Sequence, residues 1–131
     1  MLENGLTDYV KVYMPSVEVC GALDIKLIAM HPSKAFYDVN ATRALSRAFT
    51  TQTELTSLFG GATLEFGIGS WYSQERDKVV FEVVYTIKSY CNHEQLESKI
   101  DEVLSICKSI CSDFSQEAVS LEVNNKLYFI S

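Results

Sequence analysis

Two glycines beside the chain's lone tryptophan are the residues whose spacing most suggests a binding site. Every second position from 65 to 71 holds Glu65, Gly67, Gly69 and Trp71, and Tyr72 follows directly. In an extended strand alternate residues share a face, so two positions without side chains leave a shallow patch beside an aromatic wall. Such a patch suits a flat ring, for example a nucleotide base, that stacks on Trp71 or Tyr72. A neighbouring side chain packed across the glycines explains the same pattern without a ligand.

Four charged residues offer ways to hold the rest of such a ligand. Arg43 and Arg47, two of the three arginines, lie one helical turn apart, a spacing that lets both contact one phosphate or carboxylate. A solvated helix face is the plainer explanation. Glu65 and Glu82 lie in two strand-like runs, where they would accept ribose hydroxyls or form an acid–base pair if the strands place them opposite each other.

Nucleophilic catalysis has little support in the sequence. The chain has two histidines, His31 before a proline and His93 at the start of a predicted helix, and neither stands near a serine or cysteine that it would activate. His93 is explained by an exposed helix start. An acid–base site made of His31 with Glu65 or Glu82 would make the protein a small hydrolase or isomerase.

No metal or cofactor is expected. Cys107 and Cys111 lie four residues apart within an apolar helical stripe and lack a nearby third ligand, so we expect reduced core thiols. No lysine follows Gly60-Gly61 as it would in a phosphate-binding loop. The glycines at 67 and 69 precede no helix, so they match no dinucleotide-binding motif.

Hydrophobic periodicity predicts the elements that must position these residues. Alternation and composition predict strands over 9–14, 23–28 (with Gly21 at its entry), 62–72, 79–90, 117–123 and 126–130. Helical spacing predicts a helix that starts near Asn40 and ends at Gly60-Gly61. Because Thr51 and Glu54 form a capping-box pattern inside this region, it is interpreted as two short helices in succession.

The second half of the chain carries the clearest signals. Asn92 and Gln95 form a capping box ahead of a long helical stripe that runs to Phe114. The polar residues 73–77 join the two central strands as a hairpin, and Asn124-Asn125 joins the last two strands, because asparagine tolerates the positive φ of tight turns.

These elements predict a single α+β domain over residues 1–131. One antiparallel sheet of about five to seven strands, covered on one face by two main helices, buries every apolar stripe, and the element order is that of a ferredoxin-like sandwich with additions. An apolar sheet face that the helices leave uncovered would pack against a second copy, so we expect a homo-oligomer.

Composition excludes several classes of partner. The net charge is −6 and the 11 Lys and Arg residues are scattered, so we expect no duplex nucleic acid as a partner. No apolar stretch approaches the roughly 18 to 20 residues that cross a bilayer. The first residues lack the basic and apolar regions of a secretion signal, so a cytoplasmic location is expected, in the host cytoplasm if a phage encodes the protein.

Short motifs in the second half resemble a set of small uncharacterised proteins carried by bacteriophages, plasmids and prophages. The likeness covers about residues 50–131. It consists of Leu58-Phe59-Gly60-Gly61-Ala62-Thr63, Gly67-x-Gly69-x-Trp71, Val80-x-Glu82-x-x-Tyr85, Gln116-Glu117-Ala118-Val119 and Glu122-Val123-Asn124. The resemblance brings no established activity, but its genetic setting implies a small anti-defence protein.

We therefore expect a small non-enzymatic binding protein that sequesters a nucleotide-like ligand, for example an immune signalling nucleotide. Its expected contacts are Arg43, Arg47, Glu65, Gly67, Gly69, Trp71, Tyr72 and Glu82. The alternative is a protein–protein interaction inhibitor, or a structural subunit, that docks a host protein through the same face. The small hydrolase or isomerase with His31 is the third hypothesis.

Overall fold

The computed structural model describes residues 4–15, 17–18 and 39–131. Its elements follow the order β1 (Asp8–Tyr13), β2 (Val17–Glu18), α2 (Val39–Phe59), β3 (Thr63–Ser73), β4 (Lys78–Cys91), α3 (His93–Asp113), β5 (Val119–Val123) and β6 (Lys126–Ile130). The predicted strand over 23–28 with its entry at Gly21, and the predicted acid–base residue His31, lie outside the described residues.

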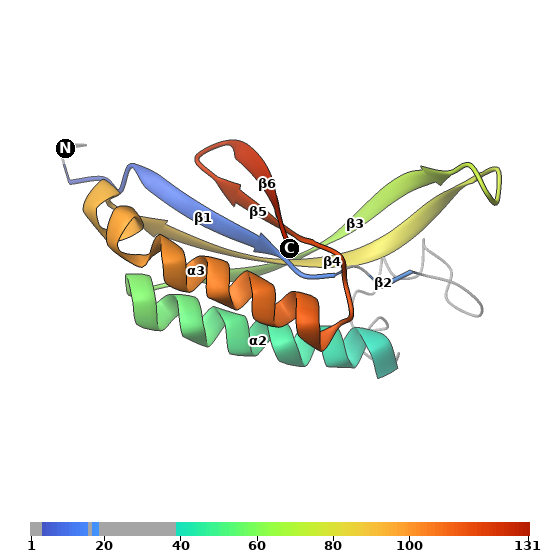
Figure 1. Cartoon of the computed structure of the whole chain (residues 1–131), viewed down its shortest axis with the longest axis horizontal. Coiled ribbons are helices and arrows are strands. Elements are labelled where there is room, and N and C mark those ends of the chain that lie inside the picture. The colour runs from blue at the N-terminus through green and yellow to red at the C-terminus, as the bar shows by residue number, and fades with distance from the viewer. Residues whose placement is uncertain (1–3, 16, 19–38) are drawn as a thin grey trace.

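The sheet has the predicted ferredoxin-like arrangement with additions (Figure 1). The four main strands lie in the order β5-β1-β4-β3, and each neighbouring pair is antiparallel. The predicted α+β class, with an antiparallel sheet and two helices on one face, is confirmed. Of the additions, β6 pairs with β5 at one edge, and β2 pairs with β4 next to the end of β1.

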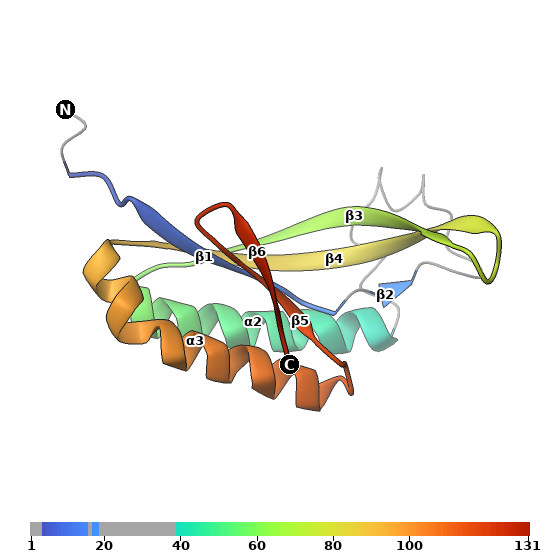
Figure 2. The same cartoon turned by 45° about the horizontal axis from the view of Figure 1, so that its top comes forward.

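Both helices pack against the same face of the sheet, and the other face carries no helix among the described residues (Figure 2). We call this second face the open face. The helix-facing side chains form the core, which includes Val10, Val12, Leu55, Tyr85, Ile87, Val103, Cys107, Ile110 and Leu121. Burying such apolar surface stabilises the fold by about 25 cal/mol per Å², and this gain holds the layers together. None of the described helices is long and apolar enough to pass through a bilayer.

The region predicted as two short helices is one helix, α2, of 21 residues. Thr51, predicted to cap a second helix, lies inside α2 and is fully buried. The hydroxyls of Thr50, Thr53, Thr56 and Ser57 each donate to the carbonyl oxygen four residues earlier, which lets hydroxyl side chains remain within a continuous helix. Gly60 ends α2 with a φ of 95°, the predicted left-handed stop.

The elements of the second half match their predictions closely. The capping box of Asn92 and Gln95 is present at the start of α3: the Asn92 side chain accepts from the Gln95 amide, and the Gln95 side chain accepts from the Asn92 amide. The turn residues Asn124 and Asn125 have φ values of 49° and 70°, as a tight two-residue hairpin requires. β3 and β4 pair over the whole length of β3.

An ion cluster joins the first turn of α3 to the first strand. His93 Nδ1 lies 3.1 Å from Asp8 Oδ2, and His93 Nε2 lies 3.0 Å from Glu97 Oε1. The hydrogen bond to Asp8, with the nearby charges of Glu97 and Asp8, raises the pKa of His93 above 6.5. Only a protonated imidazole donates to both carboxylates, so this cluster links β1 to α3 in the charged form of the ring.

Removal of the cap should weaken α3 measurably. We expect Asn92→Ala to lower the free energy of unfolding by about 1 kcal/mol, because the substitution leaves the Gln95 amide without its acceptor. Urea titration checks this value. The control Ser105→Ala, at an exposed position in the same helix, should raise stability by at most about 0.5 kcal/mol. Equal losses in both variants would count against the cap.

Stability should depend on pH through His93. Because its pKa is raised on folding, the contribution of His93 is fully present below about pH 6.5, the unfolded value, and is lost as pH rises through the folded pKa. Urea unfolding of the wild type and of His93→Gln between pH 5.5 and 9 should show the largest difference at the acidic end. A difference that grows with pH would contradict this assignment.

Candidate functional site

The register of the β3–β4 hairpin brings five of the predicted site residues to the open face. Gly69 pairs with Glu82, and Gly67 pairs with Val84. Glu65 and Trp71 lie two residues before Gly67 and two residues after Gly69, so they share the face of the two glycines. Trp71 Nε1 donates to Glu82 Oε1 at 2.8 Å, and Trp71 is 46% exposed. The indole is thus fixed at its polar edge while much of its surface is accessible.

The positions of Gly67 and Gly69, which we call the glycine strip, form a low surface beside Trp71. A Cβ atom at Gly67 would meet nothing within 4 Å, whereas one at Gly69 would lie 3.3 Å from Val84 Cγ2. Side-chain packing therefore accounts for the glycine at 69 but not for the one at 67. The open space above Gly67 is what a flat ligand would need.

A pocket of about 270 Å³ adjoins the glycine strip across β4. Glu82 and Val84, which pair with the two glycines, form one of its walls, and Tyr13 from the end of β1 forms another. The remaining lining residues are Met14, Pro15, Gln116, Ala118, Val119 and Ser120. We call this cavity the Tyr13 pocket. It combines one carboxylate with an aromatic side chain and polar groups.

A carboxylate held by two tyrosines lies next to the Tyr13 pocket. Glu122 on β5 accepts hydrogen bonds from the hydroxyls of Tyr9 and Tyr13, the second at 3.1 Å. Asn125 completes the group, since its amide donates to the Tyr9 hydroxyl at 2.9 Å. These residues come from β1, β5 and the turn after β5, so the antiparallel pairing of β1 with β5 assembles them.

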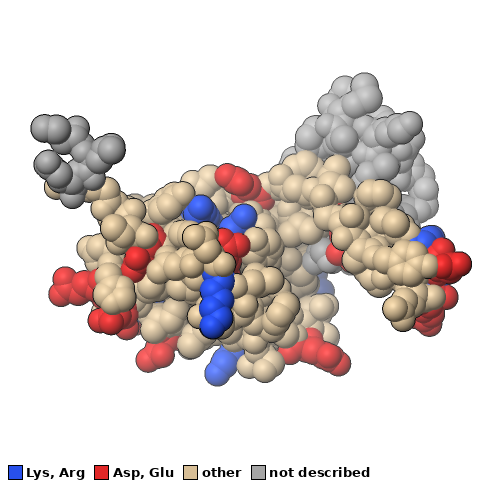
Figure 3. Space-filling view, turned by 90° about the horizontal axis from the view of Figure 1, so that it is seen from above, with Lys and Arg blue, Asp and Glu red and all other residues tan. Residues whose placement is uncertain are grey.

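Electrostatics keep Glu122 ionised. The hydrogen bond from Tyr9, assisted by Tyr13, Lys11 and Lys88, lowers the pKa of Glu122, and the same bond raises the pKa of Tyr9. The Lys88 ammonium lies 4.2 Å from the ring centroid of Tyr9, and Lys11 lies 5.1 Å from that of Tyr13. On the open face, basic side chains gather near the middle of the molecule, while acidic ones lie mostly toward its edges (Figure 3).

Glu65 and Glu82 do not form the predicted acid–base pair. Glu65 pairs with Thr86, whereas Glu82 pairs with Gly69, four residues further along β3. Four residues of a strand span about 13 Å, which is too far for a shared proton. Tyr72 also departs from the prediction, because its position in β3 places it on the opposite face from Trp71, where its hydroxyl donates to Asp77.

Arg43 and Arg47 lie on α2, beneath the sheet, and bind the end of α3 instead of joining the open face. Arg43 donates to the carbonyl of Asp113, and its guanidinium lies 4.6 Å from the ring centroid of Phe114. Arg47 forms ion pairs with Glu54 at 2.7 Å and with Asp113 at 3.4 Å. The prediction that these two arginines contact a ligand at the glycine strip is wrong, because the sheet separates their side chains from the open face.

Sequence reasoning missed the polar cluster around Glu122. Tyr9, Lys11 and Tyr13 occupy every second position of β1, which indicates the solvent-facing side of a strand, and this was the one signal of the cluster in the sequence. The partners Lys88 and Glu122 lie far away in sequence, and only the pairing of β1 with both β4 and β5 brings them together.

The cysteines and possible metal ligands offer no reactive centre in the described part of the chain. Cys107 is fully buried, and burial raises the pKa of its thiol to about 12, so this thiol stays protonated. Cys91, Cys107 and Cys111 are free. Among the described residues, no group of three or more His, Cys, Asp or Glu is arranged to hold a metal ion.

Solved structures with a similar fold come from phage enzymes. The chain resembles a phage SAM lyase in its apo state with a TM-score of 0.55 and 16% identity, covering 100% of this chain and 94% of that one. A phage SAM lyase in complex with S-methyl-5'-thioadenosine gives a TM-score of 0.49 and 14% identity, covering 100% and 96%. Neither a protein-family model nor a curated protein matches the sequence.

This likeness corrects the functional prediction. The expected non-enzymatic binding protein is wrong, because the whole chain shares its fold with an enzyme, the phage SAM lyase. At this level of identity the likeness shows the fold.

The hydrogen bonds around Glu122 give a direct test of the site's electrostatics. We expect Tyr9→Phe to raise the pKa of Glu122, because the substitution removes the hydrogen bond that lowers it most, and Tyr13→Phe to raise it less. An NMR titration of the Glu122 carboxyl carbon in each variant measures both pKa values. An unchanged value in Tyr9→Phe, or a larger rise in Tyr13→Phe, would show that the cluster is ordered differently.

Proposed function

We propose that the protein is a lyase that cleaves SAM, with the substrate bound on the open face across the glycine strip and the Tyr13 pocket. The observation that carries the proposal is that these two features meet at β4, where Glu82 and Val84 pair with the two glycines and also line the pocket. The fold shared with a phage SAM lyase supplies the reaction class.

The parts of SAM match the parts of this surface. The flat adenine ring fits the side-chain-free strip beside Trp71, where Gly67 leaves open space. Glu82, which lies between the strip and the pocket, is placed to accept the ribose hydroxyls. The sulfonium cation then lies in the Tyr13 pocket, where the Glu82 carboxylate in the pocket wall attracts positive charge.

This arrangement also fits the chemistry of a lyase. The carbon–sulfur bond to the amino-acid part of SAM breaks as the carboxylate of that same part closes onto the carbon to form a lactone, so a neutral thioether leaves and no second reactant is consumed. The chain then contributes chiefly by holding the substrate in a reactive conformation. The pocket volume of about 270 Å³ is smaller than the roughly 300 to 1,000 Å³ typical of pockets that enclose a whole ligand. Part of the substrate must therefore rest on the open glycine strip.

Substrate turnover tests the proposal. The wild-type protein should consume SAM, followed by chromatography and mass spectrometry. Glu82→Gln should lower kcat/KM by about tenfold to a hundredfold, because hydrogen bonds to a charged acceptor contribute about 1.5 to 3 kcal/mol. Gly67→Leu should raise KM by filling the space for the ring.

Gly67→Ala is the matched control for Gly67→Leu. Its small side chain meets no neighbour in the fold, so the stability of this variant should stay close to that of the wild type, and its KM should rise less than that of Gly67→Leu. SAM recovered unchanged after prolonged incubation with folded wild-type protein would overturn the proposal.

The predicted homo-oligomer and cytoplasmic location stay predictions. Exposed apolar side chains are consistent with a homo-oligomer: Ile68, Trp71, Tyr72, Val79, Phe81, Leu127, Tyr128 and Phe129 are each at least 38% exposed. So many large apolar groups on the surface of a small domain favour association with another chain.

A further inference from the structure

The edge strand β6 lacks the features that normally protect a sheet edge. Within the described residues it pairs with β5 and with no other strand, so its outer backbone groups lack a strand partner. Natural edge strands carry charges, prolines or bulges that prevent further pairing. The sequence of β6 is Lys-Leu-Tyr-Phe-Ile, with one charge at its first residue, and Phe129 is 71% exposed. An edge of this kind favours pairing with a strand of another chain.

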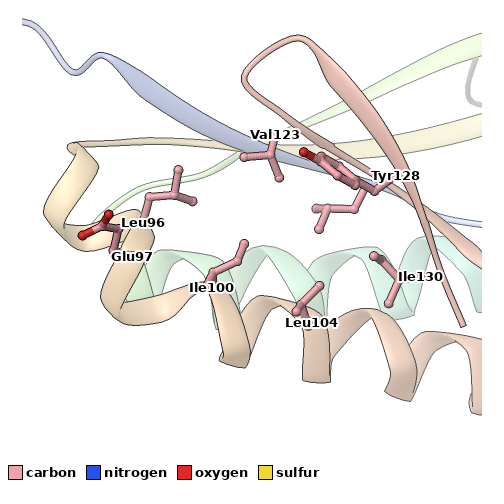
Figure 4. A pocket seen from close by; sticks show the side chains of 8 residues that line it. Leu96, Glu97, Ile100, Leu104, Val123, Tyr128 and Ile130 are labelled. Atoms are coloured by element: carbon pink, nitrogen blue, oxygen red, sulfur yellow. The ribbon is translucent and has the colours of Figure 1, made fainter.

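An unfilled apolar pocket lies beneath the same strand. Its volume is about 430 Å³, and it lies between α3 and the β5–β6 hairpin (Figure 4). The residues that line it are Leu96, Glu97, Ile100, Leu104, Leu121, Val123, Tyr128 and Ile130. Because Leu121 and Val123 alternate with Glu122, this pocket and the Glu122 cluster lie on opposite faces of β5. It is therefore separate from the proposed SAM site.

Charge favours this edge as a contact between two copies. The chain carries a net charge of −6, so two copies repel each other unless they meet where acidic side chains are absent. β6 contains one lysine and no acidic residue. Leu127 and Phe129 project to the open face, and Tyr128 and Ile130 project toward α3, on the same side as Lys126.

We propose that β6 pairs antiparallel with β6 of a second copy, about a two-fold axis at Tyr128, to form one continuous sheet. This register pairs all five residues of both strands. It places Leu127 opposite the partner's Phe129 on the open face and Tyr128 opposite the partner's Tyr128 on the helix side. An isologous contact of this kind closes after two copies and leaves neither edge free.

The same register covers the mouth of the apolar pocket. Paired strands lie about 4.8 Å apart, so the partner's Tyr128 stands directly beyond Tyr128, and the partner's Lys126 stands directly beyond Ile130. The mouth of each pocket is thereby covered by the Tyr128 ring and the alkyl stem of Lys126 of the other copy. This interface does not involve the proposed SAM site, and its test is independent of lyase activity.

Charge substitutions at two opposed positions test both the interface and its register. We expect the wild type to have twice the 14.7 kDa mass of the chain in light scattering coupled to size exclusion, or another even multiple. Leu127→Lys combined with Phe129→Lys should halve the mass, because each introduced lysine faces another lysine across the interface. Leu127→Lys combined with Phe129→Glu should keep the wild-type mass, because each lysine then faces a glutamate.

The two variants carry charges at the same sites and differ only in the sign of one of them, so lost folding alone cannot separate them. Circular dichroism shows that each variant is folded, and hydrogen exchange should show additional protected amides in β6, beyond those bonded to β5, only in the associated variants. A monomeric wild type, an odd number of chains, or equal masses for the two variants would overturn the proposal.

Discussion

The pairing register of β3 with β4 is the constraint on which the candidate site depends. It fixes which side chains share the open face, and a slip of one residue would move every side chain of β3 to the other face. In the observed register Gly67 and Gly69 lie beside Val84 and Glu82, the residues that also line the Tyr13 pocket. Apolar burial pins this register, because Tyr85 and Ile87, on the alternate positions of β4, are buried beneath the sheet.

The second constraint is the central place of β1. Because β1 pairs with β4 on one side and β5 on the other, Tyr9 and Tyr13 reach Glu122, and Tyr9 also lies close to Lys88. The open face thus holds an ionised carboxylate among tyrosines and lysines, next to a pocket whose own carboxylate is Glu82. The helix side supplies stability, and the open face supplies the chemical groups.

Local signals explain which features could be predicted from the sequence. The capping box at Asn92, the turn at Asn124-Asn125 and the hairpin joined by residues 73–77 depend on residues close together in the sequence, and each was predicted correctly. The break predicted at Thr51 was wrong because Ala48, Thr51 and Leu55 are all buried on one face of α2, so the packing of this helix continues across the predicted break. The local sequence pattern could not reveal that the packing of α2 against the sheet would bury this threonine in the middle of a helix.

The candidate site was predictable only in part for the same reason. Gly67, Gly69, Trp71 and Glu82 were found because they lie in two adjacent strands, whereas Arg43 was misplaced because helical spacing says nothing of which side of the sheet the helix covers. The Glu122 cluster joins residues more than 100 positions apart, so periodicity could not reveal it. The proposed lyase activity rests on the fold and not on any motif.

Proton–nitrogen correlation NMR during a titration with SAM would test most directly that the substrate binds on the open face, since the single tryptophan gives one indole signal. We predict that the signals of the Trp71 indole and of the Gly67 and Gly69 amides shift together as SAM is added, while the signals of the Arg43 and Arg47 amides on the far side of the sheet do not shift. Shifts confined to α2, or no shift on the open face at saturating SAM, would contradict this prediction.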